Sequence, residues 1–141
     1  MNNLARAALD RYQITDNSSI VYADPHALIL KLMDGAMERI CQAKGAIQHG
    51  NNETKGKFIG KAIGIIAGLD GCLQRDPENS LSNNLEAIYE YMNMRLLEAN
   101  VENDVSKLDE VARLMGEIRA GWMQIPDEAR QSHARENVGS K

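Results

Sequence analysis

Apolar residues recur at helical spacing along most of the chain, in four blocks that short polar connections separate. The first block opens at Asp24-Pro25, a pair typical of a helix start, because aspartate accepts hydrogen bonds from free amides and proline fits the first turn. It continues to about His49. The same spacing predicts helices over about 53–74 and 81–100, and a fourth from a cap at Asn103-Asp104 to near Gln124.

The connections between these four predicted helices are short, so sequential helices should be neighbours that run in opposite directions. Alternation typical of strands does not occur in the sequence. We therefore expect an all-α fold, an antiparallel up-down four-helix bundle over residues 24–124. Residues 1–23 contain apolar side chains and should pack on the bundle as an N-terminal segment, whereas the polar residues 125–141 are expected to be a disordered tail.

Composition limits the partners. The chain has 141 residues, enough for one domain, and a formal net charge of -4 with basic residues interleaved among acidic ones. Phosphate binding needs a basic patch, so we expect no nucleic acid partner.

No apolar run approaches the roughly 20 residues of a membrane span, and no secretory signal is evident, so we expect a cytoplasmic protein without membrane insertion. Cys41 and Cys72 are expected to be reduced, buried thiols.

Catalytic and metal-binding patterns do not occur in the sequence. A di-iron bundle needs Glu-x-x-His pairs, and neither these nor a phosphate-binding loop, a nucleophile elbow or a Cys-x-x-Cys pair is found. The three histidines, His26, His49 and His133, fall at a helix start, a helix end and the tail, where we expect solvated side chains. We therefore expect no enzyme activity, no catalytic or metal site and no cofactor.

Two of the predicted helices carry a second set of apolar residues beside the main stripe. Met94, Leu97 and Val101 lie roughly opposite the core stripe of the third helix, which favours an interaction face there. On the first helix, Leu30, Met37 and Cys41 form a narrower edge that either widens the core or adds a second face. A partner helix, a second copy of the chain or the N-terminal segment could occupy such faces.

The second predicted helix has glycines spaced by four, at Gly56, Gly60, Gly64 and Gly68, on a side away from its isoleucine stripe. Each interior glycine costs about 0.5–1 kcal/mol relative to alanine, so this helix should be intrinsically weak. The stripe indicates either a smooth groove where another backbone approaches closely or small surface residues without a special role.

Several sequence motifs then match one family in order. The third predicted helix carries the most specific one, Asn84-Leu85-x-x-Ile88-Tyr89-x-Tyr91-Met92-x-x-Arg95-Leu96-x-x-Ala99-Asn100. The first carries Asp24-Pro25-x-x-Leu28-Ile29-x-x-Leu32-Met33-Asp34-Gly35-Ala36. With weaker motifs in the second and fourth helices, the chain over about 12–124 resembles the FliS family of flagellin-export chaperones. It departs from the family pattern at Asp24, at Met33 and in the glycine stripe.

The resemblance implies a bundle that binds the disordered C-terminal segment of flagellin in the cytoplasm. Such a chaperone prevents premature polymerisation and assists delivery to the flagellar type III export apparatus, with an export-gate component or flagellar regulators as further partners. It also implies an N-terminal cover over an apolar pocket, to which we assign Tyr12 and Ile14. The expected partner-binding residues are Tyr12, Ile14, Leu30, Met37, Tyr89, Met94, Leu97 and Val101.

Free of its client, such a chaperone should be a monomer or weak dimer. The alternative from another class is an oligomeric or regulatory helical scaffold that binds itself or a flagellar regulator.

Overall fold

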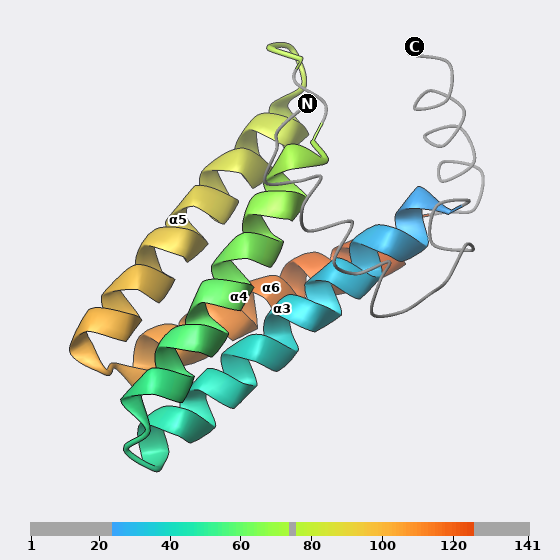
Figure 1. Ribbon diagram of the computed structural model, residues 1–141. Helices are drawn as coiled ribbons and strands as arrows, with labels where there is room; N and C mark the ends of the chain where they lie inside the picture. The colour runs from blue at the N-terminus through green and yellow to red at the C-terminus, as the bar shows by residue number, and fades with distance from the viewer. Residues whose placement is uncertain (1–23, 74–75, 126–141) are drawn as a thin grey trace.

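The computed structural model describes residues 24–73 and 76–125 (Figure 1). Every regular element within these ranges is an α-helix: α3 (Pro25–Gln48), α4 (Asn52–Gly71), α5 (Ser80–Glu102) and α6 (Val105–Met123). The four helices follow the predicted blocks to within three residues at their ends. The all-α prediction and the order of its helices are therefore confirmed.

Each helix begins at a side chain that caps its free amides. The carboxylate of Asp24 accepts a hydrogen bond of 3.2 Å from the amide of Ala27, as its pairing with Pro25 predicted. Asn51, Asn79 and Asp104 cap the other three helices in the same way. Each capping residue directly precedes its helix and so marks the end of the preceding connection.

The helices form a closed ring in which each packs mainly on two others. α3 packs on α4 and α6, and α5 packs on the same two helices. Figure 1 shows α4 and α5 running side by side in opposite directions, with α3 and α6 forming the second antiparallel pair. The turn from α5 to α6 is tight, since Asn103 takes a left-handed conformation with φ of 55° and so ends α5 sharply. The predicted up-down bundle is confirmed.

The core lies where the apolar stripes of all four helices meet. Each fully buried leucine or isoleucine contributes about 1.5–3 kcal/mol relative to an exposed one, so this shared core supplies most of the stability. The largest completely buried side chains are Leu32, Met33, Ile59, Ile66, Leu69, Met92, Leu96, Leu108, Val111 and Met115.

Three sequence-based expectations about single residues are wrong. His26, expected to be solvated, is only 6% exposed, because it stacks on Trp122 of α6. Tyr89, expected on a binding surface, is 3% exposed and belongs to the core. Burial raises the pKa of the Tyr89 phenol above its ordinary value of 10.0. Cys41, expected to be buried, is exposed, while Cys72 is half-buried.

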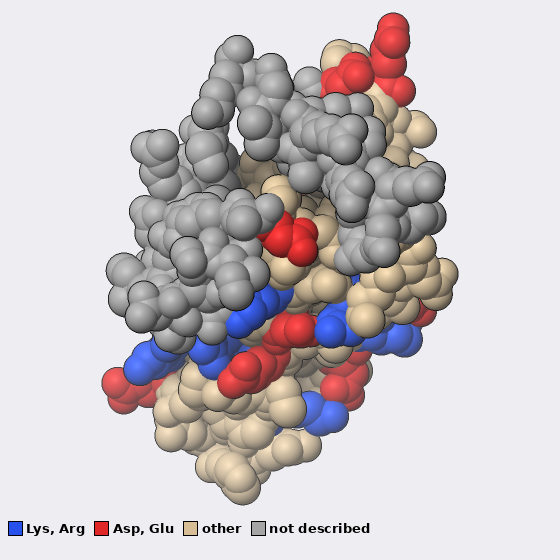
Figure 2. Space-filling model, turned by 90° about the vertical axis from the view of Figure 1, so that its right-hand side faces the viewer, with Lys and Arg blue, Asp and Glu red and all other residues tan. Residues whose placement is uncertain are grey.

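Acidic and basic side chains are interleaved on the molecular surface. On the face shown in Figure 2, lysine and arginine side chains alternate with aspartate and glutamate across a band of the molecule. Cross-helix ion pairs follow this pattern: Lys44 lies 2.9 Å from Asp109, and Arg119 pairs with Asp34. Both pairs join α3 to α6. Because they are exposed, each contributes little to stability.

Candidate partner-binding surface

The main candidate site is the outer side of α5. Met94 is 56% exposed, Leu97 is 57% exposed and Val101 is 83% exposed, although all three side chains are large and apolar. They follow one another at i, i+3 and i+7, which places them on one side of the helix. We call these three residues the α5 apolar face.

The α5 apolar face is separate from the core. Met92, Leu96 and Ala99 are completely buried on the inner side of the same helix. At 100° per residue, the exposed residues point away from these buried ones. The apolar residues of α5 thus form two faces, one packed and one exposed, as the sequence predicted.

On one side the α5 apolar face borders α4. Two contacts mark this seam: the amide nitrogen of Asn93 lies 3.4 Å from the main-chain oxygen of Ile63, and a Cβ atom on Gly56 would lie 4.0 Å from the side-chain oxygen of Asn100. A Cβ added to Gly60 or Gly64 would meet nothing within 4 Å. Gly60 and Gly64 therefore leave open space on α4, whereas Gly68 of the same stripe is buried.

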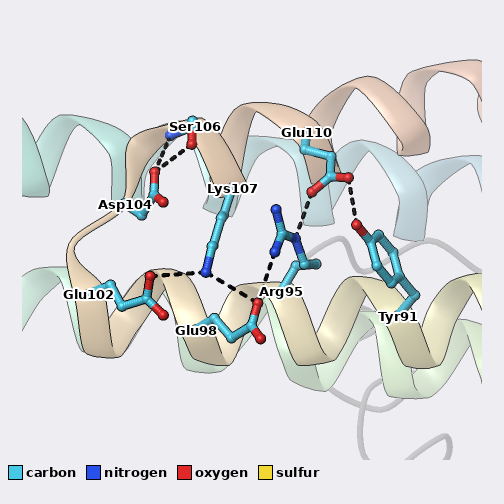
Figure 3. Close-up of polar contacts among 8 residues, drawn as sticks. All are labelled: Tyr91, Arg95, Glu98, Glu102, Asp104, Ser106, Lys107 and Glu110. Atoms are coloured by element: carbon cyan, nitrogen blue, oxygen red, sulfur yellow. Dashed lines mark hydrogen bonds and ion pairs between the residues drawn. The ribbon is translucent and has the colours of Figure 1, made fainter.

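On its other side the face borders a network of charged residues between α5 and α6 (Figure 3). The carboxylate of Glu110 accepts a hydrogen bond of 2.6 Å from the Tyr91 hydroxyl and another of 2.7 Å from Arg95. Arg95 also binds Glu98, which lies 3.3 Å from the Lys107 ammonium. Glu102 and the helix cap at Asp104 and Ser106 extend the network toward the α5–α6 turn.

This network changes the ionisation of its members. The hydrogen bond from Tyr91, followed by that from Arg95, lowers the pKa of the Glu110 carboxyl below its ordinary value of 4.5. The same hydrogen bond raises the pKa of the Tyr91 phenol. The Tyr91–Glu110 hydrogen bond is the main cause of both shifts, because it stabilises the charged carboxylate and the protonated phenol. Glu110 therefore remains ionised and holds α5 against α6 at neutral pH.

At the end of α5 a buried lysine contacts the last turn. Lys55 of α4 is 7% exposed, and its ammonium group donates hydrogen bonds to the main-chain oxygen of Asn100, at 2.8 Å, and to the side-chain oxygen of Asn103, at 2.6 Å. A cation at a helix C-terminus is favourable, because it satisfies free carbonyl groups and opposes the helix dipole. Lys55 thus fixes the end of α5 that carries Val101.

The other predicted site residues lie elsewhere. Met37 of α3 is half-buried and packs against the core, with its terminal carbon 3.8 Å from a Cβ atom placed on Gly116 of α6. It therefore widens the core, the simpler of the two alternatives for that edge. Leu30 is half-buried on the same side of α3. Tyr12 and Ile14 lie outside the described residues.

Two other kinds of site do not occur among the residues that the structure describes. Among residues 24–73 and 76–125, no three histidine, cysteine, aspartate or glutamate side chains gather where they could hold a metal ion. Within the same ranges, no helix combines the length and the apolar character needed to cross a bilayer.

Comparison with known proteins decides the family. The model of the family "Flagellar protein FliS" matches residues 8–129. The chain belongs to the FliS family. The flagellar secretion chaperone FliSB of Pseudomonas aeruginosa is 45% identical over 119 residues, which are 84% of this chain and 94% of that protein. The flagellar secretion chaperone FliS of Vibrio cholerae is 38% identical, over 87% of this chain and 91% of the relative.

A more distant relative agrees with these two. The flagellar secretion chaperone FliS of Bacillus subtilis is 35% identical over 92% of both chains. FliS is a family of chaperones, so the prediction that the chain is not an enzyme is confirmed, as is the resemblance found in the motifs. Membership supports a role as an export chaperone and makes an exposed apolar surface an expected feature, since a chaperone must cover apolar parts of its client.

The periodicity of the sequence did not reveal the roles of three residues that shape this surface. Lys55 is separated from its partners Asn100 and Asn103 by more than 40 residues, so only the register between α4 and α5 brings them together. Arg95 and Glu110 are likewise joined across the α5–α6 turn. One feature of the sequence could have indicated the role of Lys55. It falls on the apolar side of its helix, where a buried ammonium group needs hydrogen-bond acceptors.

Proposed function

We propose that this chain is a cytoplasmic export chaperone that binds the disordered C-terminal segment of flagellin. In this role it keeps flagellin from polymerising before secretion and assists its delivery to the flagellar type III export apparatus. The observation that carries the proposal is the α5 apolar face, where Met94, Leu97 and Val101 stay exposed on a helix whose opposite side already fills the core. The relatives named as flagellar secretion chaperones support the export role in this proposal.

The physics of the complex fits this role. An amphipathic segment that is unfolded before assembly must cover its apolar stripe, and each Å² of apolar surface buried contributes about 25 cal/mol. Ordering the segment into a helix opposes binding, so the net affinity is low for the area that is covered. A complex of this kind can be both specific and releasable at the export apparatus.

The N-terminal segment has a part in the same proposal. We assign Tyr12 and Ile14 to a cover that lies over an apolar pocket of the free chaperone and that the client displaces. The cover would hide apolar surface from other proteins until flagellin is present. Because the client must displace the cover, its net affinity is lower, which suits a client that is later released.

Polymerisation of flagellin provides a direct test. Purified flagellin monomers are seeded, and filament growth is followed by light scattering with and without an equimolar amount of the chain. The proposal expects growth to be delayed by the wild-type chain and not by the Leu97→Glu plus Val101→Glu variant, whose circular dichroism should stay unchanged because both side chains are exposed. Equal growth with and without the wild-type chain would contradict the proposal.

Sedimentation at micromolar concentration separates this function from an oligomeric scaffold. The chaperone should be a monomer or weak dimer when free and should form a defined complex with the flagellin segment. A tight oligomer that the Leu97→Glu substitution dissociates would assign the α5 apolar face to a second copy of the chain instead.

A further inference from the structure

The described methionines differ in how far solvent reaches them. Met94 of α5 is 56% exposed and Met123 of α6 is 55% exposed, whereas Met37 is half-buried against the core. The others are at most 1% exposed and belong to the core: Met33, Met92 and Met115. An oxidant dissolved in water therefore reaches Met94 and Met123 first, and Met94 is a member of the α5 apolar face.

The two exposed sulfur atoms have different surroundings. The Nη1 atom of Arg119 donates a hydrogen bond of 2.9 Å to the Sδ atom of Met123. This contact engages a lone pair of the sulfur and places a guanidinium charge beside it. No described residue donates a hydrogen bond to the sulfur of Met94. The lone pairs of Met94 are thus the more available of the two for reaction.

The charges near Met94 are of both signs. On α5, Glu90 and Glu98 lie one turn to either side of it, and Glu98 already pairs with Arg95. The neighbouring helix α4 exposes one acidic and two basic side chains, Glu53, Lys57 and Lys61. No single charge therefore dominates at Met94, and the contact with Arg119 is what distinguishes Met123.

We propose that Met94 is an oxidation site that switches the α5 apolar face off when a peroxide is present. A lone pair of its sulfur attacks one peroxide oxygen, and the O–O bond breaks as the S–O bond forms. The proton of the attacked oxygen passes to the leaving oxygen, which departs as water. The sulfur is oxidised by two electrons and the peroxide is reduced. The inference rests on the proposed function and adds a chemical control of the same face.

Oxidation changes the face and spares the fold. Methionine sulfoxide carries a polar S=O group, so a client that covers Leu97 and Val101 would have to strip water from this group without replacing its hydrogen bonds. We expect binding to weaken about tenfold or more. The bundle should stay folded because Met94 is not part of the core. A methionine sulfoxide reductase restores the thioether, which makes the switch reversible.

Rates of oxidation test the geometry. The full chain is treated with dilute hydrogen peroxide, catalase stops the reaction, and peptide mass spectrometry follows the sulfoxide at each methionine. Met94 should oxidise faster than Met123 although both are equally exposed. Arg119→Leu keeps an apolar side chain beside Met123 but removes the donor and the charge, so only the rate at Met123 should rise. Equal rates in the wild-type chain, or a faster rate at Met123, would contradict the inference.

Binding before and after peroxide tests the switch. The oxidised chain is treated with dithiothreitol, which restores the thiol of Cys41 and leaves the sulfoxide in place, and is titrated in a calorimeter. The probes are the C-terminal peptide of flagellin and a designed peptide with a leucine stripe. Oxidised wild type should bind both about tenfold or more weakly than the untreated chain, and sulfoxide reductase should restore the affinity.

Two leucine variants form a matched pair for this measurement. Met94→Leu should have the same affinity before and after peroxide, whatever its starting value, because the reactive sulfur is gone. Met123→Leu should lose affinity on oxidation as the wild type does. If oxidised wild type binds as tightly as the untreated chain, or if Met94→Leu loses as much as Met123→Leu, the switch is overturned.

The two peptides separate this inference from the proposed function. If the flagellin peptide binds the untreated and the oxidised chain equally, the switch is overturned while flagellin binding stands. If the leucine-stripe peptide shows the expected loss and the flagellin peptide does not bind the untreated chain, the switch is supported and the proposed client is wrong. If neither peptide binds the untreated chain, both proposals are overturned.

Discussion

The imidazole Nε2 atom of His26 lies 2.8 Å from the main-chain oxygen of Trp122, and the Trp122 indole donates a hydrogen bond of 3.1 Å back to the main-chain oxygen of His26. The two rings stack with centroids 5.1 Å apart. The first turn of α3 is thereby joined to the last turn of α6, which closes the ring of helices at this end. In both hydrogen bonds, the side chain of one helix contacts a main-chain oxygen in the terminal turn of the other.

Substitution of His26 should therefore destabilise the bundle. His26→Phe keeps an aromatic ring for the stack but removes the hydrogen bond to the Trp122 oxygen, and we expect the free energy of unfolding to fall by about 1–2 kcal/mol. Urea titration followed by the fluorescence of Trp122, the one tryptophan of the chain, measures this directly. His49→Phe at the exposed end of α3 is the matched control, and an equal effect of both substitutions would contradict the role of the contact.

Lys55 should be more important for stability than its exposed neighbour. Lys55→Met keeps most of the apolar stem but leaves the oxygens of Asn100 and Asn103 without their charged donor, so we expect a loss of about 1.5–3 kcal/mol in the free energy of unfolding. Lys57→Met, two residues away and exposed, should change it by less than about 0.5 kcal/mol. Equal losses in the two variants would show that the buried contact does not support α5.

The pKa of Glu110 gives the stability a defined dependence on pH. Its pKa in the folded chain is lower than the ordinary value of 4.5, so its contribution is complete above about pH 4.5 and is lost as the pH falls through the folded pKa. The difference in unfolding free energy between wild type and Glu110→Gln should be largest near neutral pH and should shrink on acidification.

Tyr91→Phe provides the control for this effect, because it removes the hydrogen bond that contributes most to the shift. In this variant the pKa of Glu110, measured by NMR titration of its carboxyl group, should rise toward 4.5. An unchanged pKa would mean that Arg95 alone sets the ionisation of Glu110.

Removal of residues 1–18 tests the proposed cover. If Tyr12 and Ile14 belong to a displaceable cover, the shortened chain should bind the flagellin peptide more tightly or should increase the fluorescence of a dye that binds exposed apolar surface. The reason is that the client no longer competes with the chain's own segment. Weaker peptide binding after truncation would assign these residues to direct contact with the client.

The fold was predictable because each of its determinants is local. Capping side chains such as Asp24 and Asp104 precede apolar spacing of helical period, and both signals can be read within one turn. The α5 apolar face was predictable for the same reason, since Met94 and Leu97 follow the same periodicity on the side opposite Leu96. The family motif then gave the chaperone class.

Residues whose environment is set by another helix were not predictable in this way. His26 falls at a helix start, where solvent exposure is usual, and only the position of Trp122, 96 residues away, buries it. Tyr89 was expected among the partner-binding residues, yet the packing of α5 places it in the core. Cys41 has an apolar neighbourhood in the sequence but lies on the outer side of α3.

The central claim is that the α5 apolar face binds the C-terminal segment of flagellin, and isothermal titration calorimetry of that peptide into the full chain tests it most directly. The account predicts binding by the wild type, no measurable binding by Leu97→Glu plus Val101→Glu, and unchanged binding by Gln48→Glu plus Ala120→Glu, which adds the same charge at exposed sites elsewhere. All three chains should show the same circular dichroism. Equal affinity of the wild type and the Leu97→Glu plus Val101→Glu variant would contradict the account.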